Sequence, residues 1–208
     1  MQNRLVERIL RGLSRFQESV YPEHRDLFKE LALGQRPLAL FITCSDSRID
    51  PAMLTQAKPG ELFICRVIGN IIPRYPNMAG GVTATLEYAA GVLRVPDIIV
   101  CGHTDCGVMK GALRPETVES LPAVSSWLAN VQPARATLSQ SGLDPADPAF
   151  LLALTERNVV EQLNNLQTHP SVMTRLNEGS VRIHGWVYHI AEGVVTAYDA
   201  STRQFVQI

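Results

Sequence analysis

The amino-acid sequence predicts an α/β fold with a mainly parallel central sheet flanked by helices and an extended N-terminal helical arm. Short apolar runs of buried-strand type alternate with segments of helical periodicity, which is the pattern of a parallel sheet covered by helices. Only helical signals precede the first of these runs. A chain of 208 residues with no linker or internal repeat suits one well-buried domain, so we expect a single domain over residues 1–208.

The N-terminal segment is expected to be helical. Apolar residues recur at helical spacing over residues 3–19, which predicts an amphipathic helix. These apolar residues are Leu5, Ile9, Leu13 and Phe16. We expect Tyr21-Pro22 to break this helix, and a second helix over residues 23–33 to end at Gly34.

Five later segments have the character of strands. They cover residues 37–43, 61–68, 98–102, 181–190 and 194–198. Helical periodicity fills residues 80–95 and, in the main, residues 120–178. In a parallel sheet of this kind, functional groups gather beyond the carboxyl ends of the strands.

Composition indicates which classes of partner and which cellular compartment to expect. A formal net charge of −1 argues against nucleic acid or an anionic membrane as the main partner. No apolar run approaches the roughly 20 residues that a transmembrane helix needs, and residues 1–20 mix Arg and Glu without a signal-peptide core. Four cysteines in a chain of this size without an export signal are expected to be reduced thiols, so we expect a cytoplasmic protein.

Two polar segments directly follow predicted strands. Cys44-Ser45-Asp46-Ser47-Arg48 comes after the strand that ends at Thr43, and His103-Thr104-Asp105-Cys106-Gly107 comes after the strand that ends at Gly102. A parallel sheet could bring both segments to one edge, with two thiolates, an imidazole and a carboxylate within reach of one ion. Soft thiolate and imidazole ligands in tetrahedral array favour zinc.

The spacing also indicates which kind of zinc site this is. Structural sites usually close all four positions with paired Cys or His units. Here His103-x-x-Cys106 is one pair, and Cys44 stands alone about sixty residues earlier. Three protein ligands with one exchangeable position are typical of a catalytic zinc, which lowers the pKa of its bound water. We expect one Zn²⁺ per chain.

Asp46 and Arg48 complete the motif. An aspartate two residues from Cys44 can reach the metal itself or accept a hydrogen bond from its water, and Arg48 could pair with the carboxylate at two points. If the pair holds, the fourth metal position stays open to water; if the pair breaks, Asp46 can close it as a fourth ligand. Cys65 and Cys101 lie in the middle of predicted strands and are expected to be core thiols.

Together, Cys-x-Asp-x-Arg and the later His-x-x-Cys-Gly resemble the β-class carbonic anhydrases. Further similar segments are Pro59-Gly60-Glu61-Leu62-Phe63 and His184-Gly185-Trp186-Val187-Tyr188, and the resemblance covers about residues 3–206. It implies a zinc lyase that interconverts carbon dioxide and bicarbonate by zinc-bound hydroxide. It also implies that Cys44, His103 and Cys106 are the ligands. The Asp46–Arg48 dyad would orient the metal-bound water and gate the site.

The resemblance further implies a narrow apolar pocket for carbon dioxide at a dimer interface. The matching positions are Gln35, Phe63, Ile68, Tyr88 and the backbone amide of Gly107. It implies a homodimer that can pair further into a dimer of dimers, with the N-terminal helix packed across the neighbouring subunit. One departure is Val67, which stands where the family usually has an asparagine.

Within the family, the fourth metal position follows one of two patterns. Either water occupies it, or the aspartate moves onto zinc when bicarbonate fills a regulatory pocket formed by Trp, Arg and Tyr. Arg66 and Tyr188 match two members of that pocket, but Phe41 stands at the tryptophan position. A buried anion needs its donors, so we predict that Asp46 pairs with Arg48 at neutral pH.

Two alternatives stay open from the sequence. The same site could hydrate a sulfur analogue, carbon disulfide or carbonyl sulfide. A protein of another class, with a structural zinc or a redox switch built from the four cysteines, would use the same residues without catalysis. The two tryptophans, Trp127 and Trp186, are expected to serve packing, and His169 is expected to be solvated. pH balance, bicarbonate supply and cyanate metabolism all use the reaction, and the sequence favours none of them.

Overall fold

A six-stranded sheet with helices on both faces forms the larger part of the computed structural model, which describes residues 2–77, 80–140, 142–145 and 147–208. The chain divides into two compact units, residues 1–36 and 37–208, and each is described by itself. The expectation of one domain over the whole chain stays a prediction. Among the described residues, no helix is long and apolar enough to cross a membrane.

The N-terminal unit is helical, as predicted. It contains α1 (Gln2–Arg15), a wider helical turn (Phe16–Val20), α2 (Tyr21–Glu23) and α3 (Arg25–Leu31). The predicted break at Tyr21-Pro22 is wrong, because the wider helical turn continues directly into α2 and Val20 and Tyr21 both keep helical geometry. The backbone leaves helical geometry at His24 instead (φ −111°, ψ 17°). Of the predicted apolar face, Ile9 and Leu13 are 72% and 52% exposed, while the side chain of Leu5 lies outside the described residues.

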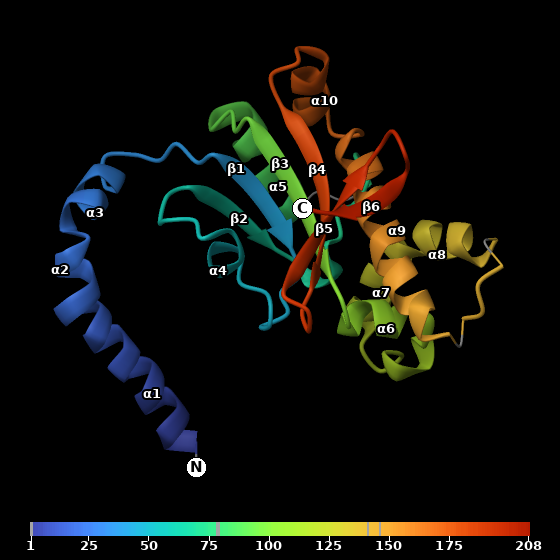
Figure 1. The fold of residues 1–208 in the computed structure, drawn as a ribbon, viewed down its shortest axis with the longest axis horizontal. Coiled ribbons are helices and arrows are strands. Elements are labelled where there is room, and N and C mark those ends of the chain that lie inside the picture. The colour runs from blue at the N-terminus through green and yellow to red at the C-terminus, as the bar shows by residue number, and fades with distance from the viewer. Residues whose placement is uncertain (1, 78–79, 141, 146) are drawn as a thin grey trace. The chain divides into compact units, whose positions relative to one another are not determined.

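The sheet confirms the predicted fold class (Figure 1). Its strand order is β2 (Leu62–Arg66), β1 (Ala39–Thr43), β3 (Asp97–His103), β4 (Arg182–His189), β5 (Val194–Asp199) and β6 (Gln204–Gln207). The first four strands in this order run parallel to one another, and the β4–β5 and β5–β6 pairs are antiparallel. Thr43 pairs with both Arg66 and Cys101, so β1, β2 and β3 end at nearly the same level. The short edge strand β6 was not predicted.

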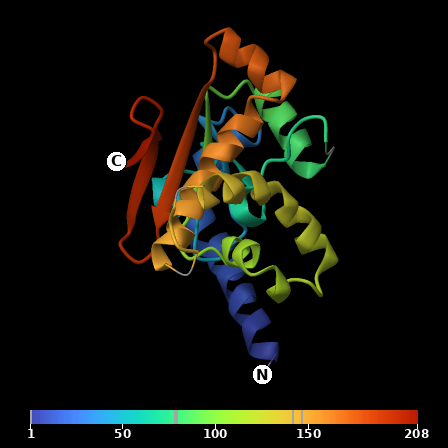
Figure 2. The ribbon, with the colours of Figure 1, turned by 90° about the vertical axis from the view of Figure 1, so that its right-hand side faces the viewer.

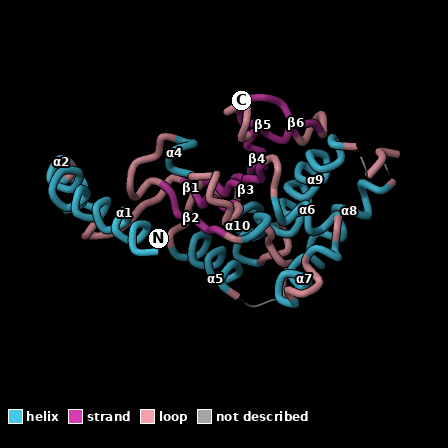
Figure 3. Tube along the Cα trace, turned by 90° about the horizontal axis from the view of Figure 1, so that it is seen from below, coloured by secondary structure: helices cyan, strands magenta, loops and turns pink. Residues whose placement is uncertain are grey.

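Helices cover both faces of this sheet (Figures 2 and 3). On one face, α5 (Gly81–Glu87), α9 (Pro148–Leu166) and α10 (Pro170–Asn177) pack on strand residues that include Leu40 and Ile98. On the other face, α4 (Pro51–Thr55) covers Phe41 and Ile99. The alternation of strand side chains between the two faces produces these two cores.

Helix α9 approaches the sheet closely because two strand residues are glycines. A Cβ atom at Gly102 or Gly185 would lie 2.9 or 2.8 Å from a methyl group of Val159. His169, at the start of α10, is buried and its ring Nε2 lies 2.9 Å from the Pro73 carbonyl oxygen. The expectation that His169 is solvated is therefore wrong.

A third cluster lies beyond the carboxyl ends of the parallel strands. It is built by α6 (Gly107–Leu113), α7 (Pro122–Leu128), α8 (Gln132–Ser139) and the N-terminal half of α9. Met109, Leu128 and Phe150 are buried in it beside Cys44 and Cys106. This cluster buries the cysteines of the two polar segments that the sequence marks as functional.

Candidate metal centre

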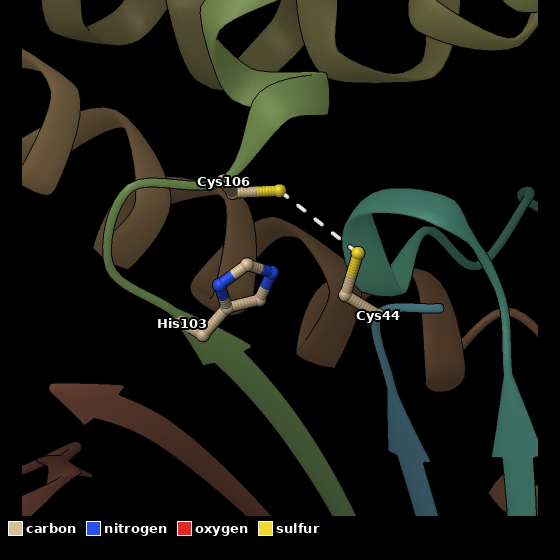
Figure 4. Close-up of side chains that lie close together, drawn as sticks. All are labelled: Cys44, His103 and Cys106. Carbon is tan, nitrogen blue, oxygen red and sulfur yellow. Dashed lines mark hydrogen bonds between the residues drawn. The ribbon is translucent and has the colours of Figure 1, made fainter. Parts of the chain in front are cut away.

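Cys44, His103 and Cys106 point toward one another at the carboxyl edge of the sheet (Figure 4). Cys44 directly follows β1, His103 is the last residue of β3, and Cys106 directly precedes α6. Their ligand atoms all lie within 4.8 Å of one another, and the residues are 3%, 0% and 2% exposed. The prediction that the sheet brings these three residues together is confirmed.

One ring nitrogen of His103 is free to bind a metal ion. Its Nδ1 lies 2.9 Å from the Thr104 carbonyl oxygen, to which an Nδ1–H donates, leaving the Nε2 lone pair free. Nε2 is buried and has no hydrogen-bond partner among the described residues. A buried polar atom without a partner is costly, and a metal ion would satisfy it. Two thiols and one imidazole are the donors that zinc prefers, so these residues fit zinc.

The two thiols contact each other. Their Sγ atoms are 4.0 Å apart. Hydrogen bonding from Cys106 is the main cause that lowers the pKa of Cys44 to about 4, and the Gly69 backbone N–H, 3.3 Å from the sulfur, acts in the same direction. The neighbouring Cys44 thiolate and burial raise the pKa of Cys106. Two sulfurs that share one proton would both become thiolates around a divalent cation.

Arg48 bridges the two polar segments. Its Nε and Nη2 donate to the two oxygens of Asp46 at 3.0 and 2.8 Å, and its Nη1 donates to Asp105 Oδ2 at 2.9 Å. Asp105 also forms an ion pair with Lys110. The Arg48 hydrogen bonds hold the pKa of the Asp46 carboxyl well below its usual range. Asp46 Oδ2 lies 3.8 Å from His103 Nε2, so the paired carboxylate stands next to the ligand cluster.

Arg66 has a structural task that the sequence did not indicate. Its guanidinium donates to the backbone carbonyl oxygens of Cys44, Asp46 and Ile49 at 2.6 to 3.2 Å and so holds the loop after β1. Phe41, which the resemblance places at a tryptophan position, is fully buried and packs edge-on against Trp186. The Nε and Nη2 donors of Arg66 are thus engaged by backbone oxygens of the protein itself.

Of the predicted pocket residues, only Ile68 lines a groove beside the cluster. The groove has a volume of about 410 Å³, and its lining residues are Ser45, Val67, Ile68, Ala123, Val124 and Trp127. Gly107 begins α6, with open space where a Cβ atom would be. Phe63 and Tyr88 contact each other, with ring centroids 5.9 Å apart, and are not among the lining residues. Gln35 belongs to the N-terminal unit.

The other two cysteines are core residues, as predicted. Cys65 and Cys101 are both buried, and all four cysteines are free thiols. Burial raises the pKa of Cys101 to about 12, so it is a poor thiolate at neutral pH. This environment argues against a redox pair between Cys101 and Cys106.

Comparison with known proteins places this site in a family. The family model described as carbonic anhydrase matches residues 39–195. A carbonic anhydrase of Pseudomonas aeruginosa is 48% identical over 200 residues, covering 96% of this chain and 90% of that protein. Carbonic anhydrase 1 of Escherichia coli O157:H7 is 44% identical over 203 residues, covering 98% and 92%.

Solved structures agree with the sequence matches. The β-carbonic anhydrase CcaA has a TM-score of 0.93 at 43% identity, covering 98% of this chain and 99% of that chain. A tetrameric β-carbonic anhydrase of Sordaria macrospora has a TM-score of 0.82 at 26% identity, covering 93% and 96%. The family model, the relatives and the shared fold lead to one conclusion: this chain belongs to the β-carbonic anhydrase family.

Proposed function

We propose that this protein is a zinc-dependent carbonic anhydrase that reversibly hydrates carbon dioxide to bicarbonate. The observation that carries the proposal is the buried cluster of Cys44, His103 and Cys106, in which the His103 Nε2 atom faces both sulfurs without a hydrogen-bond partner among the described residues. These three side chains would hold one Zn²⁺ per chain. When bound, zinc would act as a Lewis acid that lowers the pKa of a water molecule towards neutrality, so that it can attack carbon dioxide.

The Asp46–Arg48 dyad would orient the reacting water and gate the metal. Both carboxylate oxygens of Asp46 accept hydrogen bonds from Arg48, and Oδ2 also lies near His103 Nε2. A carboxylate fixed in this way can accept a hydrogen bond from a group at the fourth metal position without occupying that position. Asp105 accepts further hydrogen bonds from the same guanidinium through Oδ2 and its backbone oxygen, which helps to hold Arg48 in place. We propose that Asp46 stays paired with Arg48 at neutral pH. Phe41 has no indole N–H to bind a regulatory anion, and Arg66 already donates to backbone oxygens, which disfavours the closed state.

The substrate side of the site would be completed by a second subunit. Ile68 and Trp127 give the groove beside Ser45 an apolar wall suited to carbon dioxide. The exposed apolar residues of α1 would pack on the neighbouring subunit of a homodimer, which can pair further into a dimer of dimers. Phe63, Tyr88 and Gln35 would then reach the groove of the partner. Four free thiols support a cytoplasmic location.

Zinc analysis and a hydration assay on the purified protein test the function. We expect one zinc per chain and stopped-flow hydration of carbon dioxide, both lost on chelation and both restored by added zinc. Tightly bound zinc without hydration of carbon dioxide would refute the catalytic role and favour a structural zinc. Turnover of carbon disulfide or carbonyl sulfide in its place would show that the substrate is wrong.

Arg48→Ala tests the gate. Without the guanidinium, Asp46 is free to move onto the metal, so we expect hydration to fall about ten- to hundredfold, the usual effect of losing a group that supports metal ligands. The control is Arg182→Ala, which removes another two-point arginine–aspartate pair. Arg182 donates to both oxygens of Asp97 at 2.8 Å, and Asp97 lies at the start of β3, at the opposite end from the cluster. If Arg48→Ala keeps the activity of the control, the dyad does not gate the site.

A further inference from the structure

The peptide group between Ile68 and Gly69 is held at one end by a tryptophan and contacts a metal ligand at the other. Trp127 Nε1–H donates to the Ile68 carbonyl oxygen at 3.1 Å. The Gly69 N–H donates to the Cys44 sulfur at 3.3 Å. The Ile68 carbonyl and the Gly69 N–H belong to the same planar peptide unit. Fixing the direction of one therefore fixes the direction of the other.

The surroundings confine this peptide and provide one side-chain hydrogen bond to its carbonyl. Gly69 has left-handed backbone geometry (φ 68°, ψ 17°), and a Cβ atom there would lie 2.9 Å from a Val108 methyl group. The next peptide along is held separately, because Asn158 Nδ2 donates to the Gly69 carbonyl oxygen at 3.1 Å. Among the described residues, the Trp127 indole is the only side chain that binds the Ile68 carbonyl. It is thus the group that sets the tilt of the peptide facing the thiolate.

Hydrogen bonds in series also change one another's strength. A hydrogen bond donated to a carbonyl oxygen polarises the peptide group and makes the N–H at its other end a better donor. A donor aimed at a thiolate is charge-assisted and is among the stronger hydrogen bonds in proteins. Groups of this kind behind a metal ligand orient the ligand and tune its electron density.

We propose that Trp127 is a positioning residue for the metal ligand Cys44, acting through the Ile68–Gly69 peptide. The inference rests on the proposed function in one respect, namely that Cys44 holds the metal. It assigns to the indole N–H a task beyond packing and beyond lining the groove, where Trp127 also lies. The indole N–H acts on the ligand through the Ile68–Gly69 peptide and not on the reacting atoms, so this role is a positioning role and not a catalytic one.

The second tryptophan provides a matched control. Trp186 is half-buried like Trp127, and its ring packs edge-on against Phe41 with centroids 6.0 Å apart. No hydrogen bond of its indole N–H is found among the described residues. Trp186→Phe therefore removes the same atoms from a packed aromatic side chain without disturbing a donor to a metal-site peptide.

The test compares Trp127→Phe with Trp186→Phe in the full-length protein. Zinc affinity is measured by chelator competition, and the sulfur-to-metal charge-transfer band is measured after substitution with Co²⁺. We expect Trp127→Phe to bind zinc about tenfold more weakly, within the range known for outer contacts to metal ligands. We expect its charge-transfer band to move to longer wavelength, because a sulfur that loses its donor is more electron-rich. The Trp186→Phe variant should match the wild type in both.

A second variant removes only the donor. In the Trp186→Phe background, Trp127 is the single tryptophan, so an auxotrophic host can replace it with benzothienylalanine, in which sulfur takes the place of the indole N–H. This side chain keeps the shape and packing of tryptophan, and we expect the same weaker affinity and the same band shift. Unchanged affinity and an unchanged band in this protein would overturn the inference. A wild-type protein that binds no zinc would overturn the proposed function, and this inference with it.

Discussion

Gln162 of α9 is the centre of a buried hydrogen-bond network that holds the loop leaving β2. Its Oε1 accepts the Ile72 N–H at 2.7 Å, and its Nε2 donates to Asn158 Oδ1 at 2.9 Å. Ile72 and Asn158 are both fully buried. Gln162→Leu keeps the approximate size of the side chain and leaves these two polar groups without partners. At about 1–3 kcal/mol for each group, the expected loss of unfolding free energy is about 2–6 kcal/mol.

Thermal unfolding at a fixed excess of zinc measures this loss, since a bound metal shifts apparent stability. For a chain of this size, a loss of about 3 kcal/mol lowers Tm by about 6–12 °C. The control is Gln167→Leu, the same chemical change at the exposed C-terminal end of α9, where Nε2 makes only a 3.3 Å contact with the Leu163 carbonyl oxygen. That variant should stay within about 0.5 kcal/mol of the wild type. Equal shifts in Tm for both variants would refute the reasoning.

Three further predictions address the metal, the arm and acid stability. Cys106→Ser should lose zinc and hydration activity together, whereas Cys65→Ser should keep both; full zinc content in Cys106→Ser, measured by mass spectrometry, would exclude Cys106 as a ligand. Ile9→Glu should shift the oligomer towards monomer in analytical ultracentrifugation, and an unchanged oligomer would rule out a packing role for this face of α1. Hydrogen bonding to Arg182 is the main cause that lowers the pKa of Asp97, so its stabilisation is present above the unfolded pKa of about 4 and is lost as pH falls through the folded value. Asp97→Asn should therefore lower the urea midpoint at pH 7, with the difference from the wild type shrinking in acid.

The fold class and the ligand cluster were predictable from the sequence for a physical reason. Buried parallel strands appear as short apolar runs, and the residue after each run lies at the carboxyl edge. Cys44 and His103 take their positions from strand ends that the register places side by side. The same reasoning missed β6, because this short, exposed edge strand has no apolar run.

The contacts that support the cluster are harder to predict from the sequence. Asp105 lies inside the second motif, and its spacing carries a signal: a carboxylate between His103 and Cys106 lies at the same edge as Arg48 and pairs with it. Arg66 was linked to an anion pocket by resemblance, whereas its donors bind backbone carbonyl oxygens, a type of contact that no sequence pattern encodes.

Two long-range contacts explain where sequence reasoning ends at this site. Trp127 meets Ile68 across 59 positions of the chain, and Gln162 meets Ile72 across 90. Both side chains bind backbone groups, and the backbone offers the same N–H and carbonyl at nearly every residue, so neither partner leaves a mark in the sequence. A half-buried tryptophan is normally explained by packing, and a glutamine on a helix by solvation. Only the position of α7 and α9 over the loop after β2 gives these two residues their roles, which is why Trp127→Phe and Gln162→Leu test the structure and not the motif.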